Sequence, residues 1–440
     1  MKNNFKKRVQ YFFNLPLLTQ HVAASQRNLR INSEKLAKIQ EKKLRLIIRY
    51  AYEHNIFYHK LYREKKVNPY EIKTITDLKK IPIVERKTMQ DNFPRTVSID
   101  VDPNQCFKLQ TSGSTGMPLT VLVDTATQIQ RRILSLRQFF ECGGKRKYKQ
   151  MEFRNVDDMP LPVENIPISI GRKLIDWPFP RSIRVPINNI ALDRAKSILL
   201  KKKPEVIFGY PSFLYSLVET LEEKYGSQIL FTTGEMLTYD YRKMIKSKFC
   251  GNIIDSYGCT EVGDIGWECP NEHVGYHLNT DSVFVEFIKE GNNVSDGEEG
   301  EIVLTDLTNT AMPFIRYKIG DIGLLGDSLC SCGRTLPLMR TLKGRSDDFV
   351  LLPSGKKISP LALLDLNTMK GIFEFRVVQR NSRLIELWIR AAENTEVNVQ
   401  KFVSAVKDVI GEDIEIRIRL VEKIPVDKSG KLRRIISDMV

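Results

Sequence analysis

The stretch Val206-Ile207-Phe208-Gly209-Tyr210-Pro211-Ser212 decides how the chain folds, because an apolar strand passes directly into a helix start. Proline suits the first turn of a helix, where its fixed φ is already helical and its missing N–H is not needed. We therefore expect a helix over 211–225. A strand at 229–233, a helix at 239–249 and a strand at 253–257 follow in the same rhythm. Strands that alternate with helices predict an α/β fold.

Further elements are expected upstream of this alternation. Apolar residues at helical spacing predict helices over 26–65 and 125–142, and an apolar run predicts a strand at 119–123. The proline-rich segment 145–190 lacks such spacing and is expected to be an irregular surface excursion.

Downstream, strands are expected at 283–288 and 301–305, with a turn at 290–293 between them, and the pattern changes around 343–348. The elements expected after this change are strands at 349–352, 373–379, 384–390 and 415–421 and a helix at 397–410. This last part has a normal domain size. The sequence thus predicts an α/β protein with three parts, namely a large N-terminal domain with mixed βα sheets (1–343), a hinge (344–348) and a small mobile α+β domain (349–440).

Charge and cysteine content narrow the class of protein. The 440 residues carry a net charge of +15, from 68 basic and 53 acidic side chains, but the charges are scattered and lack an aromatic-basic nucleic-acid signature. No nucleic-acid partner is expected; the basic N-terminus leaves peripheral membrane contact open. No apolar run approaches the roughly 20 residues of a membrane-spanning helix. Seven cysteines without a secretion signal argue against a disulfide framework. We expect a cytoplasmic protein, and a dimer is compatible with the sequence.

A glycine-rich segment precedes the strand expected at 119–123. It reads Gln110-Thr111-Ser112-Gly113-Ser114-Thr115-Gly116-Met117-Pro118. Glycines allow the backbone to approach a ligand, and hydroxyls and amides in such a turn form a donor surface for an anion. The segment lacks the Gly-Lys-Ser/Thr ending of a Walker loop. A polyphosphate site is favoured over a flexible linker.

Two acidic motifs follow. Tyr257-Gly258-Cys259-Thr260-Glu261 comes after an expected strand, where ligands of open α/β sheets gather, and a carboxylate there can hold Mg²⁺. Asp321, in Arg316-Tyr317-Lys318-Ile319-Gly320-Asp321, can accept both hydroxyls of a ribose. The alternatives are an ordinary strand-to-loop turn and an aspartate in a β-turn.

Two further motifs lie near the domain change and the C-terminus. Leu342-Lys343-Gly344-Arg345-Ser346-Asp347-Asp348 suits either a hinge or a capping turn. Asp427-Lys428-Ser429-Gly430-Lys431-Leu432-Arg433-Arg434 can deliver a mobile lysine to a reacting phosphate or carboxylate, or is a solvated basic tail.

Together these five motifs resemble, in order and spacing, the adenylate-forming ligases, which include the acyl-CoA synthetases. Segments that resemble the phenylacetate–CoA ligase branch, with its capsule-locus relatives, are 46–58, 77–83, 209–212 and 233–235. The resemblance implies an enzyme that adenylates a carboxylic acid with ATP and transfers the acyl group to a thiol, with coenzyme A as the expected acceptor and an aryl acid favoured. The alternatives are adenylation or acyl and amide formation without coenzyme A, in polysaccharide or cofactor biosynthesis, and a degenerate nucleotide-binding scaffold.

The resemblance also implies roles for individual residues. Lys431 would bridge carboxylate and phosphate, Thr260 would contact phosphate, and Glu261 would place Mg²⁺. The residues expected to contact the nucleotide are Thr111, Ser112, Gly113, Ser114, Thr115, Gly116, Gly234, Glu235, Tyr257, Gly258, Asp321 and Arg345. The residues expected to line the acid pocket are Tyr210, Pro211, Phe213 and Tyr257, although aromatic residues here, Phe231 included, equally suit an ordinary core. Asp347 and Asp348 would form the hinge.

A separate cluster offers metal ligands. Cys330 and Cys332 are one residue apart, Cys269 lies upstream, and His273 and His277 follow it. Three thiolates and one imidazole are a structural zinc set, whereas the alternative is buried free cysteines. Because the resembled branch includes members with such a site, zinc is favoured. His277 is the preferred imidazole ligand and His273 its rival.

Overall fold

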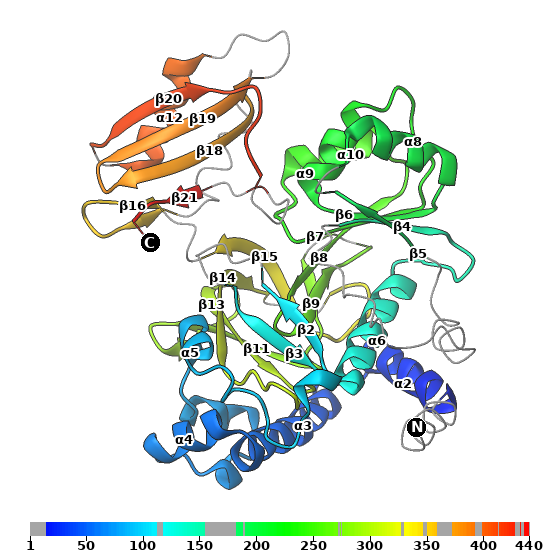
Figure 1. The fold of residues 1–440 in the computed structure, drawn as a ribbon, viewed down its shortest axis with the longest axis vertical. Coiled ribbons are helices and arrows are strands. Elements are labelled where there is room, and N and C mark those ends of the chain that lie inside the picture. Colours follow the sequence, from blue (N-terminus) through cyan, green and yellow to red (C-terminus); the bar gives the residue numbers. More distant parts are fainter. Residues whose placement is uncertain are drawn as a thin grey trace.

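The structure is a computed structural model that shows a large part followed by a smaller C-terminal part, drawn in orange and red in Figure 1. It describes residues 15–111, 118–154, 182–187, 190–271, 273, 275–326, 330–345, 350–358, 372–391, 398–411, 413–426, 432 and 435–439. The predicted fold class, α/β with a small C-terminal α+β domain, is confirmed.

One half of the central sheet is parallel, and helices pack beside it (Figure 1). Its strands, in spatial order, are β5 (Ser182–Pro186), β4 (Gln150–Arg154), β6 (Val206–Gly209), β7 (Ile229–Thr233) and β8 (Asn252–Cys259). Its helices are α8 (Leu192–Lys202), α9 (Pro211–Glu219) and α10 (Tyr239–Lys248). The predicted βα alternation is therefore confirmed.

Two predictions in this half are wrong in part. Segment 145–190 contains β4 and β5, where a surface excursion was expected. Met151 and Phe153 alternate inward and are fully buried, and Pro186 ends the edge strand, a place where proline is tolerated. Helix α9 also ends at Glu219, six residues before its predicted end, because the chain must leave the helix to form the bridge between Tyr225 and Phe249.

The other half of the sheet is antiparallel. Its strands, in spatial order from β8, are β9 (Gly263–Glu268), β10 (Tyr276–Leu278), β15 (Leu338–Arg345), β14 (Tyr317–Leu325), β13 (Glu299–Asp306), β11 (Val283–Lys289) and β12 (Asn292–Asn293), with β1 (Val84–Glu85) pairing in parallel beside β14. The turn expected at 290–293 is shorter than predicted. Only Glu290 and Gly291 form it, with φ of 52° and 82°, because Asn292 and Asn293 pair with β11.

Strand β15 reaches into the expected hinge. Gly344 and Arg345 belong to β15, and Arg345 pairs in register with Asp321 on β14. The first two residues of 344–348 therefore lie in the large sheet, while Asp347 and Asp348 lie outside the described residues.

The N-terminal region is helical, as predicted, but divided. Asn32 and Asn55 cap two of its helices, which explains the breaks within 26–65. The elements before the sheet are α2 (Leu15–Asn28), α3 (Ser33–His54), α4 (Ile56–Glu64), η1 (Pro69–Glu71), η2 (Ile75–Lys80), α5 (Arg86–Asp91), η3 (Pro103–Gln105), β2 (Phe107–Gln110), β3 (Thr120–Val123) and α6 (Thr125–Glu141). The predicted strand at 119–123 and helix at 125–142 are confirmed within a residue.

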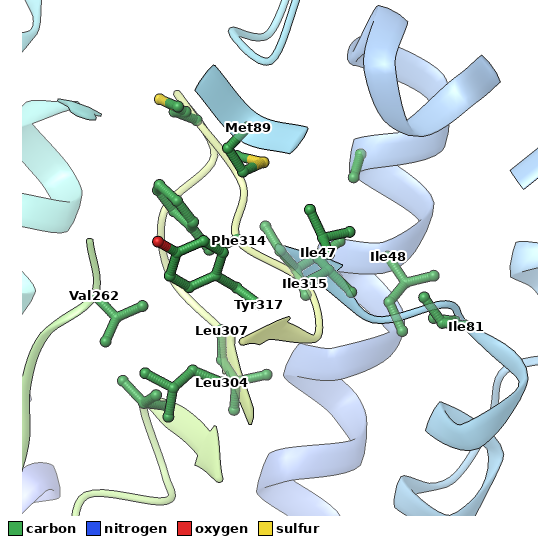
Figure 2. Packing of buried hydrophobic residues seen from close by; sticks show 14 of the residues in the cluster. Ile47, Ile48, Ile81, Met89, Val262, Leu304, Leu307, Phe314, Ile315 and Tyr317 are labelled. Atoms are coloured by element: carbon green, nitrogen blue, oxygen red, sulfur yellow. The ribbon is translucent and has the colours of Figure 1, made fainter. Parts of the chain in front are cut away.

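The largest apolar core joins these helices to the antiparallel strands. In Figure 2, Ile47 and Ile48 of α3 point toward Ile315 and Ile81, and Tyr317 lies in the same cluster. Val262, which follows Glu261 in the sequence, belongs to this cluster as well. The core thus fixes the backbone on which the candidate site is built.

The C-terminal part has a core of its own. Its elements are β16 (Val350–Leu351), β17 (Lys357–Ile358), β18 (Ile372–Asn381), β19 (Leu384–Ala391), α12 (Val399–Ile410), β20 (Glu415–Leu420) and β21 (Ile435–Ser437). Phe402, Val406 and Ile410 recur every four residues on α12 and are buried, with Phe402 against Phe375 of β18. The predicted α+β elements are confirmed, but the short strands β17 and β21 were not predicted; β21 follows the expected basic tail.

No helix among the described residues is long and apolar enough to cross a membrane.

Candidate active site and metal centre

The described ends of the glycine-rich segment are held together. Thr111 follows β2, its N–H donates to the Leu119 carbonyl at 3.1 Å, and its Oγ1 accepts from the Leu119 N–H at 2.9 Å. Strands β2 and β3 pair antiparallel up to this point. The two ends of the glycine-rich segment are therefore fixed to each other, which argues against a free linker. Residues 112–117, with the predicted phosphate contacts of Ser112–Gly116, lie outside the described residues.

The turn that carries Glu261 lies between two strands. Strand β8 continues through Cys259, because it pairs antiparallel with β9 beyond the end of its pairing with β7. Tyr257 therefore lies within a strand, as the strand expected at 253–257 implied, and Gly258 does as well, although the strand was expected to end before it. Thr260 and Glu261 form the turn itself.

Glu261 is buried and fixed by its neighbours. Its Oε1 accepts from the Tyr317 hydroxyl at 2.9 Å and lies 3.8 Å from Nη1 of Arg86. Arg131 of α6 donates to the carbonyls of Thr260 and Glu261, at 3.2 and 2.6 Å. A carboxylate offers two oxygens, so the bond from Tyr317 is compatible with cation binding through Oε2. One carboxylate beside the predicted phosphate site would suit Mg²⁺, which takes few protein ligands and completes its shell with phosphate oxygens and water.

Arg86 connects the two predicted motifs. It begins α5, and one Nη donates to Thr111 Oγ1 while the other faces Glu261. Strand β1 places it there, because Val84 pairs with Tyr317. Thr111, at the start of the glycine-rich segment, and Glu261 therefore contact the same guanidinium group, although they are 150 positions apart in the sequence.

Asp321 lies inside β14, although an aspartate after a strand was expected. Its Oδ2 accepts from the Tyr257 hydroxyl at 2.7 Å, and both strands lie in the central sheet. Pairing on both sides of β14 explains why the strand passes through Asp321. Tyr257 and Asp321, two predicted nucleotide contacts, are thus joined.

The residues expected around the acid lie near the start of α9. Tyr210 and Pro211, at the N-cap and first helical position, are buried. The half-buried Phe213 packs against Phe153 with ring centroids 5.1 Å apart. Phe231 stacks on Phe208 at 4.7 Å in the core, as expected for an ordinary core residue.

The Thr-Gly-Glu turn after β7 contacts the C-terminal part. Gly234 has a φ of 81°, a value that favours glycine. Glu235 accepts from the N–H and hydroxyl of Ser212, at 3.0 and 2.9 Å, and from the Leu432 N–H at 2.8 Å. Leu432 directly follows Lys431, which lies outside the described residues. Glu235 thus joins the start of α9 to the segment of the predicted lysine.

Four predicted metal ligands meet at one place. The ligand atoms of Cys269, His277, Cys330 and Cys332 all lie within 4.8 Å of one another. Cys269 Sγ lies 3.6 Å from Cys330 Sγ, and Cys332 Sγ lies 3.3 Å from His277 Nε2. His273 instead places Nδ1 3.4 Å from Glu268 Oε1. The cluster therefore contains His277, and its donors fit a zinc ion.

The protonation of this cluster depends on its burial. Burial and the Arg334 charge lower the pKa of His277 to about 4, which keeps the imidazole neutral as a ligand must be. Burial works to raise the pKa of Cys332, but bonds from Arg334 and Cys330 outweigh it and lower that pKa. Burial raises the pKa of Cys330 to about 12, so a metal ion must displace a proton from this thiol.

A mixed sheet, a glycine-rich segment whose ends are held together, a buried carboxylate beside it and a separate α+β part are what the resemblance to adenylate-forming ligases implies. A solved structure of this fold is 2-hydroxyisobutyryl-CoA ligase in complex with 2-HIB-AMP, with a TM-score of 0.78 and 22% identity over 94% of this chain and 91% of that one.

Sequence relatives and family models agree. Phenylacetate-coenzyme A ligase of Thermus thermophilus is 25% identical over 92% of this chain and 96% of its own, and Protein CapK of Staphylococcus aureus is 21% identical over 92% and 90%. The family model for the acyl-protein synthetase LuxE matches residues 18–347, and that for the CapK C-terminal domain matches 350–438. The chain belongs to the family of the acyl-protein synthetase LuxE. Its similarity to phenylacetate-coenzyme A ligases and to CapK agrees with the resemblance found in the sequence.

Sequence reasoning missed three residues that hold the site. Arg86 and Arg131 sit on helices far from the motifs, and no local pattern marks either. Tyr317 lies in the segment quoted for Asp321, but its contact with Glu261 depends on sheet pairing. Their roles follow only from the assembled fold.

Proposed function

We propose that the protein is an AMP-forming ligase that adenylates a carboxylic acid with ATP and transfers the acyl group to coenzyme A. The observation that carries this proposal is the Arg86 guanidinium, which connects Glu261 to Thr111 at the start of the glycine-rich segment. Family membership supports it, since several relatives are phenylacetate-coenzyme A ligases. The neighbouring ligase has been solved with an acyl adenylate and coenzyme A.

In the proposed first half-reaction, a carboxylate oxygen attacks the α-phosphorus of ATP. The new bond joins this carboxylate oxygen to the α-phosphorus, and the bond from the α-phosphorus to the pyrophosphate oxygen breaks. Residues 112–116 would bind the phosphates, and Lys431 would stabilise the negative charge that gathers between carboxylate and phosphate. Mg²⁺ at Glu261 would neutralise phosphate charge. Asp321, held by Tyr257 and paired through its backbone with Arg345, would accept the ribose hydroxyls.

In the second half-reaction, the thiol sulfur attacks the acyl carbon and loses its proton, and AMP leaves. Lys431 cannot occupy the small site at the same time as the thiol. The C-terminal part therefore has to move, and we place the pivot in the proposed hinge 344–348, at Asp347 or Asp348. Proline at either position should slow one half-reaction far more than the other, because it restricts backbone rotation. Unchanged rates in both would reject the hinge.

An aryl acid is the proposed substrate class. The partly exposed Phe213, which packs against Phe153 near Tyr210, offers an aromatic surface next to the start of α9. Aromatic rings pack favourably against such surfaces. The names of the phenylacetate-coenzyme A ligase relatives support the same class.

We also propose a structural zinc ion at Cys269, His277, Cys330 and Cys332. The donor atoms are already gathered within 4.8 Å, and three thiolates with one imidazole complete a tetrahedral shell without an open position. A closed site of this kind stabilises the fold and takes no part in the reaction.

The test is pyrophosphate release across a panel of aryl and alkyl acids, with and without coenzyme A. Acid-dependent release followed by thioester formation is expected, strongest with an aryl acid. Acyl-AMP without a thioester would favour adenylation in another biosynthetic route. ATP binding by folded protein without release for any acid would favour a nucleotide-binding scaffold.

A further inference from the structure

The large part and the C-terminal part are joined by a buried hydrogen bond. The Tyr241 hydroxyl of α10 donates to Glu374 Oε1 of β18 at 2.7 Å. Both residues are almost fully buried, with 5% and 7% of their surfaces exposed. The Tyr215 ring of α9 packs against Tyr241, with centroids 5.0 Å apart. A buried carboxylate is costly unless it is hydrogen-bonded, so this contact stabilises one particular arrangement of the two parts.

A second bond joins the same two parts at a different place. Glu235 Oε1 accepts the N–H of Leu432, while Ser212 holds the Glu235 carboxylate from the other side. That N–H belongs to the peptide bond between Lys431 and Leu432. An acceptor fixed on the large part thus restrains the peptide that carries the proposed catalytic lysine.

Two contacts fix an orientation where one would leave a free rotation. Glu235 lies in the turn after β7 and Tyr241 on the helix α10 that follows this turn, and neither side chain belongs to the C-terminal core. If the C-terminal part turns to admit a thiol, both bonds must break. Their strength therefore sets how readily the part leaves this orientation.

We propose that Tyr241 and Glu235 are positioning residues that dock the C-terminal part in the orientation that serves adenylation. This inference rests on the proposed function. It assigns Glu235 to the docking of the C-terminal segment, whereas the sequence suggested a nucleotide contact.

Tyr241→Phe removes only the hydroxyl, and Tyr239→Phe on the same helix is the matched control, since Tyr239 is 73% exposed. Acyl-adenylate formation and thioester formation from supplied acyl-AMP are measured separately, in single turnovers. Tyr241→Phe should slow the first about tenfold, the factor for one lost hydrogen bond to a carboxylate, and leave the second unchanged or faster. Glu374→Gln, which keeps an acceptor oxygen, should restore most of the loss that Glu374→Leu causes.

Glu235→Ala should show the same bias toward the second half-reaction, and Ser212→Ala, which leaves the Leu432 bond in place, a smaller one. A general loss of structure would slow both half-reactions and lower the melting temperature. Equal slowing of both, or no change in Tyr241→Phe, would overturn the inference while leaving the ligase function intact.

Hydrogen exchange provides a readout that does not need activity. In the full-length protein, amides of residues 372–381 should exchange faster in Tyr241→Phe than in wild type or Tyr239→Phe. If the wild type adenylates no acid, the proposed function fails, and this exchange alone decides whether the docking exists. Identical exchange in all three proteins would reject it.

Discussion

Arg86→Met should impair both the stability and the adenylating activity of the protein, because it removes the charge and keeps the length of the side chain. Arg86 Nη1 lies 3.8 Å from the carboxylate of Glu261, which is buried. Coulomb's law with an effective dielectric constant of about 20 gives roughly 4 kcal/mol for unit charges at that distance. Arg86 is itself 18% exposed, so water screens part of this interaction. We expect unfolding to become easier by about 2–3 kcal/mol, including the lost bond to Thr111.

The chemistry should suffer more than the stability. Without Arg86, Glu261 and Thr111 lose their shared contact, and a misplaced charge-stabilising group typically costs on the order of 10² in rate. Denaturant titration and acid-dependent pyrophosphate release measure the two effects. Lys87→Met, on the exposed side of the same helix, is the control. An Arg86→Met protein with wild-type stability and wild-type release would refute the reasoning.

Three further predictions concern other parts of the molecule. Lys431→Ala should slow adenylation on the order of 10²–10³ and spare thioester formation from acyl-AMP, since its charge is needed only where carboxylate meets phosphate; equal loss of both half-reactions would contradict this role. Metal analysis should find about one zinc per chain, and a protein with Cys330→Ser and Cys332→Ser should lose both metal and stability; a fully stable wild type without metal would leave the buried-thiol interpretation. Burial raises the pKa of Asp255 to about 7, above its value of about 4 in the unfolded chain, so its contribution to the free energy of unfolding is complete at low pH and declines as pH rises from about 4 to 7. Asp255→Asn should flatten that slope in denaturant titrations, and an unchanged slope would count against it.

Local patterns predicted most of the fold. Strands β6 and β7 and helix α10 follow from apolar runs and helical spacing, which are properties of neighbouring residues. Strands β4 and β5 were not predicted, because the prolines of this segment obscured a short alternation that becomes stable only through parallel pairing, of β4 with β6 and of β5 with β4.

The candidate site was predictable in its motifs and unpredictable in its contacts. Thr111, Glu261 and Asp321 stand in recognisable segments, whereas their partners come from remote elements. The bond from Tyr257 to Asp321, for example, joins residues 64 positions apart. Such contacts depend on the register of the paired strands and on where the helices pack, and a local sequence pattern predicts neither.

The metal ligands also determine how a long piece of chain is tied. Cys269 and Cys330 lie 61 positions apart, and the chain between them forms β10 to β14, including Tyr317 and Asp321. A cross-link across such a loop removes roughly 4 kcal/mol of conformational entropy from the unfolded chain. A zinc ion here would hold together the two ends of the chain segment that forms β10 to β14. Loss of the ion would release this five-strand segment, which carries Tyr317 and Asp321 of the proposed nucleotide site. Metal depletion and loss of nucleotide affinity should therefore coincide, although no zinc ligand belongs to the proposed nucleotide site.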